Sequence, residues 1–351
     1  MISRERVVAA LYHEEPDAVP LFDFLYNEIS IRKILGKPLK SPVTLEDYMK
    51  AQKALSFDLV HIGLDAPVDY SPKRVENFYV DEWGMKYKVD ADGMSWYVDG
   101  TIKSVEDLER FQPPNPHALG RTRTLRKVLR EYGGELAIAP SVSGPFNLSW
   151  LMTGFDVFAK ALYREKSFIV RLLDLVTDIN IELGKIAIDE GAEFIWIADD
   201  MGDVHGPFVT VKQFCEFILP RFKRQVEAFK RRGVFVLLHC DGNVMPIMDD
   251  LVGAGIDAFH PCERKSGMNL AVLKERYGDR ITLIGNVEAS KLIPFGSYEE
   301  IDAQIRECFK IAAPGGGYIF ASDHSIHPGI PPERARFLFE RAKKYRKYPI
   351  R

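Results

Sequence analysis

Residues 234–242, VFVLLHCDG, carry the pattern that decides the fold, because an uninterrupted apolar run ends there in polar residues. Such a run is typical of a strand that is buried on both faces, as in a parallel sheet. Three similar runs follow, IDAFHPC (256–262), ITLIGNVE (281–288) and GYIFASDH (317–324), and helical patterns separate them. This alternation predicts repeated βα units.

Four earlier runs extend the pattern toward the N-terminus: VPLFDF (19–24), DLVHIG (58–63), ELAIAPS (135–141) and FIWIADD (194–200). Eight units predict an α/β protein with a (β/α)8 TIM barrel, formed by residues 1–351 as a single domain. The alternative is an open doubly wound sheet, but no GxGxxG follows the first run and no GxxxxGK[ST] occurs in the sequence. Residues 66–100 alternate apolar and polar residues and predict a β-hairpin inserted after the second strand, over the catalytic face.

Composition and charge exclude several classes of protein. Hydrophobic residues make up 46% and charged residues 28%, which is ordinary for a globular chain. The formal net charge of −3 disfavours nucleic acid as a partner. The four scattered cysteines indicate a reducing compartment, and neither a signal peptide nor a membrane span is recognisable. We therefore expect a cytoplasmic protein without membrane contact.

Polar residues gather where the predicted strands end, which is where barrel enzymes place their chemistry. Five of the eight histidines lie there, namely His61, His239, His260, His324 and His327. His239 and Asp241 project to the same side of their strand and offer nitrogen and oxygen to one ion. His324 ends the last strand, and Cys262 could join them at the barrel mouth. This set predicts a catalytic zinc site, with a metal-free pocket of hydrogen-bonding histidines as the alternative.

Several longer segments together resemble the uroporphyrinogen decarboxylase superfamily. They are SRERVVAALYHEEPDAVP (3–20), DEWG (81–84), LLHCDGNVMPIMDDLVGAGIDAFHP (237–261), GMNLAVLKERYGDRITLIGNVEASKLI (267–293) and GGGYIFASDHSIHPGIPPERA (315–335). The resemblance implies a barrel and one of two activities, decarboxylation of uroporphyrinogen or corrinoid-dependent methyl transfer with zinc. The decarboxylases carry an Arg-rich RQAGRY-type segment near the start, whereas PLFDFLYNEIS (20–30) stands here and no arginine follows until Arg32. The resemblance therefore favours the methyltransferase branch.

The same resemblance implies a changed zinc site. The methyltransferases hold zinc with an HxC pair and a distant cysteine; His239 matches the histidine, Asp241 stands at the first cysteine, and His324 falls about where the distant cysteine would be. Harder ligands fit a Lewis acid that polarises the oxygen of a methyl ether better than one that activates a thiol.

We accordingly expect an enzyme that moves a methyl group from a small donor, an O-methylated aromatic compound, to a separate corrinoid protein. Zinc would be held by His239, Asp241 and His324, with Cys262 as a fourth ligand. Proton donors for the leaving oxygen would be Asp199, Asp200 or Glu263. The expected substrate-binding residues are Phe22, Phe24, Tyr26, Asn27 and Trp83.

Three alternatives stay open at this point. The enzyme could transfer the methyl group from a methylated corrinoid to a thiol or to tetrahydrofolate. It could be a metal-free decarboxylase that uses His239, His324 and Asp200 as proton donors, or a barrel without activity that docks the corrinoid protein.

Overall fold

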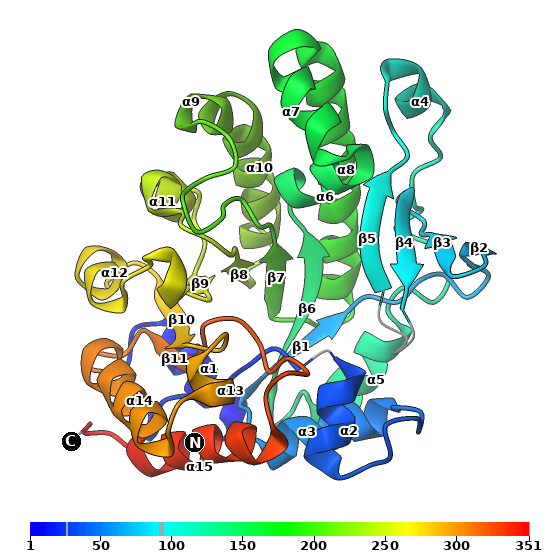
Figure 1. Ribbon diagram of the computed structural model, residues 1–351. Helices are drawn as coiled ribbons and strands as arrows, with labels where there is room; N and C mark the ends of the chain where they lie inside the picture. Colours follow the sequence, from blue (N-terminus) through cyan, green and yellow to red (C-terminus); the bar gives the residue numbers. More distant parts are fainter. Residues whose placement is uncertain (26, 91–94, 351) are drawn as a thin grey trace.

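Seven parallel strands form a curled sheet with helices on its outer side in the computed structural model, which describes residues 1–25, 27–90 and 95–350 (Figure 1). The sheet order is β1-β6-β7-β8-β9-β10-β11. The strands are β1 Leu59–Gly63, β6 Ala137–Ser143, β7 Phe194–Ala198, β8 Phe235–His239, β9 Ala258–His260, β10 Thr282–Val287 and β11 Tyr318–Ser322. This is the TIM-barrel-like α/β fold that the apolar runs predict.

The first predicted strand, residues 19–24, closes the sheet without forming a regular strand, and we call it the closing segment. Leu21 makes a parallel bridge with Phe320 of β11, and Phe22 N donates to Phe320 O at 2.9 Å. On its other side, Leu21 O accepts from Asp58 N at 2.7 Å, next to β1. The segment is irregular because Pro20 has no N–H and because the Asp23 carboxylate, in place of a main-chain carbonyl, accepts from Ser322 N at 2.9 Å.

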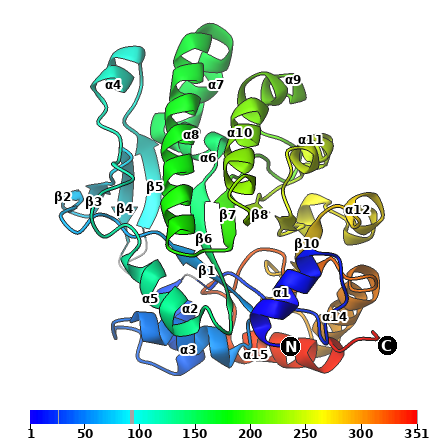
Figure 2. The same ribbon diagram turned by 180° about the vertical axis from the view of Figure 1, so that it is seen from behind.

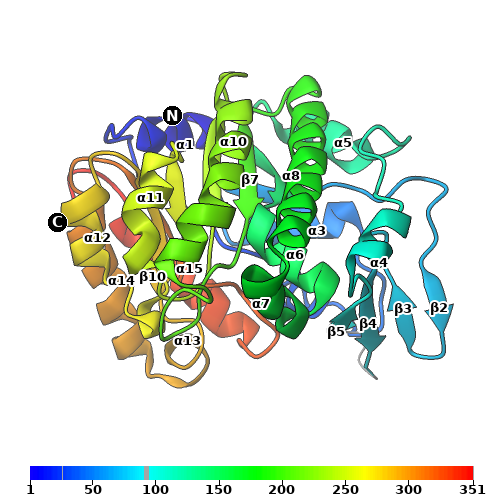
Figure 3. The same cartoon turned by 90° about the horizontal axis from the view of Figure 1, so that it is seen from above.

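Helices surround the sheet (Figures 2 and 3). They are α1 Ser3–Leu11, α2 Glu28–Leu35, α3 Leu45–Ala54, α4 Val105–Arg110, α5 Arg123–Tyr132, α6 Pro145–Thr153, α7 Phe155–Arg164, α8 Lys166–Asp189, α9 Val211–Gln213, α10 Leu219–Lys230, α11 Met248–Gly253, α12 Leu270–Tyr277, α13 Leu292–Phe295, α14 Tyr298–Ala312 and α15 Pro332–Tyr345. Val7 and Ala10 of α1 pack into the same buried cluster as Phe22, Phe24 and Trp196 inside the sheet. The interior is therefore a packed core, as in other barrels. No helix in the described ranges is both long and apolar enough to cross a membrane.

The insertion after β1 is larger than the predicted hairpin. It forms an antiparallel sheet in the order β2-β3-β4-β5, with β2 Lys73–Val75, β3 Phe78–Val80, β4 Met85–Val89 and β5 Ser95–Gly100. This sheet packs beside α6, where Tyr97 Oη donates to Leu151 O at 2.9 Å (Figure 3). Gly100 permits the approach, because a Cβ at that position would lie 2.1 Å from Met152 O. That the insertion covers the catalytic face stays a prediction.

Asp58 connects both ends of the chain to the closing segment. Its side chain is 2% exposed and accepts from Leu21 N at 2.9 Å and from Arg346 Nη1 at 2.7 Å. It also accepts from Arg6 Nη1 at 3.3 Å and from Ser3 Oγ at 2.5 Å. One buried carboxylate therefore joins α1, the closing segment, the start of β1 and the residue after α15.

We predict that Asp58→Asn lowers the free energy of unfolding by about 3 kcal/mol, because two arginines lose a buried counter-charge. Urea denaturation followed by circular dichroism measures the change. Asp279→Asn is the matched control: that side chain is 83% exposed, so its loss is expected to cost less than about 0.5 kcal/mol. Equal stability of the two variants would contradict the role of Asp58 in closure.

Candidate functional site

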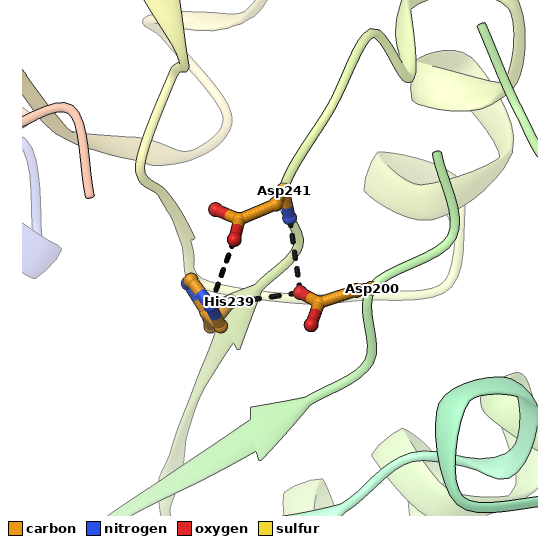
Figure 4. A group of neighbouring side chains, drawn as sticks. All are labelled: Asp200, His239 and Asp241. Carbon is orange, nitrogen blue, oxygen red and sulfur yellow. Dashed lines mark hydrogen bonds and ion pairs between the residues drawn. The ribbon is translucent and has the colours of Figure 1, made fainter. Parts of the chain in front are cut away.

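The ends of β7 and β8 bring two carboxylates and an imidazole together at the barrel mouth (Figure 4). His239 is the last residue of β8, Asp241 follows two residues later, and Asp200 follows β7. His239 Nε2 lies 3.5 Å from Asp200 Oδ1 and 3.8 Å from Asp241 Oδ2. Asp241 N donates to Asp200 Oδ1 at 3.1 Å and so holds the two loops together.

His324 reaches the same cluster from the loop after β11. Its Nε2 donates to Asp241 Oδ2 at 3.1 Å, and its Nδ1 lies 2.7 Å from Ser325 Oγ. The hydrogen bond to Asp241 and the charge of that carboxylate raise the pKa of His324 to about 9. At neutral pH His324 is therefore a cation paired with Asp241.

The two carboxylates respond differently to their surroundings. Burial raises the pKa of Asp200, and the neighbouring Asp241 charge adds to this increase. Burial also disfavours the charged form of Asp241, but His239 and His324 outweigh it and hold its pKa below the ordinary value. Of the two carboxyl groups, Asp241 thus has the lowered pKa and Asp200 the raised one.

The cluster has the composition of a metal site. Within the described part of the chain, Asp200, His239 and Asp241 can each offer one atom to a common ion, and these atoms lie within 4.8 Å of one another. Asp241 Oδ1 is buried and has no hydrogen-bond partner among the described residues, so a ligand position is unused. Nitrogen and carboxylate oxygen donors suit zinc and similar divalent ions. The residues present therefore fit the zinc ion that the sequence predicts.

The structure brings some of the predicted ligands together, but not all of them. His239, Asp241 and His324 meet at the mouth, and Asp200, predicted as a proton donor, lies among them. Cys262 does not join this group: it is buried with φ 55°, and its thiol contacts Phe259 O at 3.8 Å. Among the described residues, the group that could share one ion includes Asp200 and not Cys262, so a ligand role of Cys262 stays a prediction.

The other two predicted proton donors have structural partners. Asp199 is buried and accepts from Phe146 N at 3.3 Å and Asn147 N at 2.6 Å, at the start of α6. Burial raises its pKa to about 7. Glu263 accepts from Gly242 N at 2.9 Å and pairs with Lys265 Nζ at 3.0 Å, so it supports the loop that carries Asp241.

The predicted substrate residues are scattered. Phe22 and Phe24 are buried inside the barrel, and the Phe24 ring packs edge to face against His239 with centroids 5.0 Å apart. Phe24 thus lies directly against the cluster, and Phe22 packs against Phe24. Asn27 caps α2 by accepting from Ile29 N at 2.9 Å, and Trp83 lies in the turn between β3 and β4. Tyr26 lies outside the described residues.

His260 is a member of the site that the predicted ligand and proton-donor sets omit. It ends β9 and is paired in register with His239 of β8, and the two Nδ1 atoms lie 2.9 Å apart. Burial, together with the neighbouring histidines, keeps the pKa of His260 well below the ordinary value. The signal in the sequence was that a histidine stands near the end of each of two consecutive apolar runs, residues 234–242 and 256–262.

Comparison with known proteins identifies the relatives of this chain. The profile of the uroporphyrinogen decarboxylase family (URO-D) matches residues 78–345. A uroporphyrinogen decarboxylase of Mannheimia succiniciproducens is 24% identical over 270 residues, with 71% of each chain covered. A methylcobamide:CoM methyltransferase of Methanosarcina mazei is 26% identical over 252 residues and covers 70% of each chain.

Solved structures confirm the fold. A methyltransferase from Methanosarcina mazei superposes with a TM-score of 0.74 at 20% identity, covering 98% of this chain and 99% of the other. A B12-independent methionine synthase from Shewanella sp. W3-18-1 in complex with selenomethionine gives a TM-score of 0.54 at 14% identity, with 94% and 95% covered. At these identities the likeness supports the barrel and leaves the reaction to the residues of the site.

We predict that Asp241→Asn lowers the pKa of His324 from about 9 toward the ordinary value of about 6.5, because the charged hydrogen-bond partner is lost. A proton NMR titration of His324 in metal-free protein measures the shift. Asp203→Asn is the control, since it removes an exposed carboxylate from the loop after β7 and leaves Asp241 in place. A His324 that still titrates near pH 9 in Asp241→Asn would show that another group holds its proton.

Proposed function

This chain belongs to the uroporphyrinogen decarboxylase family, and we propose that it is a zinc-dependent enzyme that transfers a methyl group from a small O-methylated donor to a corrinoid protein. The observation that carries the proposal is the cluster of Asp200, His239 and Asp241 at the strand ends, with His324 beside it. The relatives of the chain include a methylcobamide:CoM methyltransferase, which supports this branch of the family.

The charge of the mouth supports methyl transfer over decarboxylation of uroporphyrinogen. A tetrapyrrole with many carboxylates needs cationic partners. Here Asp200 and Asp241 occupy the mouth, and the His324 cation is already paired with Asp241. An acidic site of this kind is suited to a divalent ion and a neutral or weakly charged substrate.

The identity of the ligands supports an oxygen donor. A zinc ion held by Asp200, His239 and Asp241 would supply a Lewis acid for the ether oxygen of the donor. Because these donors are harder than thiolates, they favour an oxygen ligand over a thiol. The relative's thiol acceptor, coenzyme M, is the second candidate, and the name of that relative is the observation in its favour.

The chain's own residues would handle the proton of this reaction. The carbon–oxygen bond of the donor breaks as the methyl group passes to the reduced corrinoid, so the leaving oxygen gains a negative charge and takes a proton. His324 holds a proton at Nε2, 3.1 Å from Asp241, at the edge of the cluster. We assign His324 to proton donation and Asp200 to the ligand position that Cys262 leaves empty. Phe24 supports the His239 ring from below.

We predict about one zinc ion per chain in the purified protein, and less than about a tenth of that in His239→Ala. Elemental analysis after dialysis against zinc measures the content. His205→Ala is the matched control, because His205 is an exposed histidine on the neighbouring loop. Zinc-free wild-type protein that also fails to bind added zinc would overturn the metal role and favour acid–base chemistry by His324 and Asp200.

We further predict that the zinc-loaded protein methylates free cob(I)alamin when supplied with a methoxybenzoate, and that His239→Ala reduces the rate by about 100-fold or more. The change of the corrinoid absorption spectrum measures the transfer. Two parallel assays separate the alternatives: methylcobalamin with coenzyme M tests the thiol reaction, and uroporphyrinogen tests decarboxylation. Turnover in either of these with none in the first would replace the proposed donor or the proposed reaction.

A further inference from the structure

The imidazole rings of His239 and His260 face each other through their Nδ1 atoms. Their Nδ1 atoms are 2.9 Å apart, a distance at which one nitrogen donates and the other accepts. The two residues end adjacent strands in register, so the pairing is built into the sheet and does not depend on a loop. Every neutral imidazole carries one N–H, and the position of this proton therefore decides what each outer nitrogen can do.

The outer nitrogen of His239 faces the proposed metal position. His239 Nε2 is directed toward Asp200 Oδ1 at 3.5 Å and Asp241 Oδ2 at 3.8 Å (Figure 4). With its proton on Nε2, His239 has no lone pair for an ion. With its proton on Nδ1, the lone pair on Nε2 is free, and His260 Nδ1 must accept the hydrogen bond.

The surroundings of His260 hold it in place for this task. Its side chain is 0% exposed and is enclosed by the rings of Phe22, Phe24 and Trp196, with centroids 5.6, 4.9 and 5.6 Å away. His260 Nε2 is buried without a hydrogen-bond partner among the described residues. An N–H at this atom points into aromatic surroundings, where ring faces accept it weakly. A charged imidazole would be costly there, so the surroundings favour a neutral His260.

We propose that His260 is a positioning residue of the metal site: its Nδ1 accepts the proton of His239 Nδ1 and thereby holds the His239 ring and its Nε2 lone pair toward Asp200 and Asp241. The inference rests on the proposed metal-dependent function. Outer partners of metal-bound histidines are ordinarily carboxylates, main-chain carbonyls or water, and their loss weakens metal binding by about 10- to 100-fold. Here a second histidine, buried in the barrel core, has this role.

The experiment measures the zinc dissociation constant by competition with a chromophoric chelator, independently of turnover. His260→Phe keeps a ring in the core but removes the acceptor, and we expect zinc to bind about 10- to 100-fold more weakly. His260→Asn places an oxygen acceptor near the former Nδ1 and is expected to recover part of the affinity. His61→Phe is the matched control: His61 packs on the same Phe24 and Trp196 rings, at 5.0 and 6.3 Å, without the bond to His239.

A second measurement uses the folded wild-type protein and so does not depend on the variants. In zinc-loaded protein labelled with 15N, we expect the shared proton to be attached to His239 Nδ1 and to show a nitrogen–nitrogen coupling to His260 Nδ1. A proton attached to His260 Nδ1 instead would overturn the proposal. Equal zinc affinity in His260→Phe and wild type, or equal weakening in His260→Phe and His61→Phe, would also overturn it.

Failure of this inference is distinguishable from failure of the proposed function. Wild-type protein that binds no zinc would remove both the metal role and the task assigned to His260. Wild-type protein that binds zinc and transfers methyl groups, with an unchanged dissociation constant in His260→Phe, would remove the positioning role alone.

Discussion

The parallel register of three adjacent strands is the constraint on which the site depends. Main-chain pairing places Ala198 of β7 beside His239 of β8, and His239 beside His260 of β9. Because parallel strands end at the same edge of the sheet, the residues that follow β7 and β8 leave the barrel together. Asp200 and Asp241 therefore lie on either side of His239 Nε2, while His260 lies at its Nδ1. Main-chain hydrogen bonds between the strands therefore help to fix the distances among these groups.

The barrel interior supplies the second condition, a buried aromatic surface against which the histidines pack. Phe22 and Phe24 come from the closing segment and meet Trp196 of β7 beneath the mouth. Such surroundings disfavour charged imidazoles, and burial lowers the pKa of His61 to about 4. His324 pairs with Asp241 instead, and this raises its pKa to about 9. The same fold thus lowers the pKa of His61 and His260 and raises that of His324.

Much of this arrangement could be predicted from the sequence, because it follows from strand periodicity. The apolar runs located the seven regular strands and the closing segment, and two-residue alternation put His239 and Asp241 on one side. Features that depend on backbone turns could not be predicted. The position of Asp200 beside His239 depends on the loop after β7, where the Asp200 carboxylate accepts from Asp241 N, and Cys262, whose backbone is left-handed, is not part of the cluster. Alternation in residues 66–100 indicated β-structure but could not give the number of strands, because turn positions determine how one alternating run is divided.

The two carboxylates at the mouth give a physical reason for a cation that does not depend on relatives. Asp200 and Asp241 lie at the same imidazole, and burial together with Asp241 raises the pKa of Asp200. The carboxylates repel each other, and this repulsion contributes to the raised pKa of Asp200, whereas His324 compensates the charge of Asp241. A divalent ion between the carboxylates would compensate both charges and would use Asp241 Oδ1, which otherwise has no partner among the described residues. Ion binding would then be coupled to the release of protons from the site, because carboxylates and imidazoles bind a metal ion in their deprotonated forms, and the repulsion between Asp200 and Asp241 would give way to attraction for the ion.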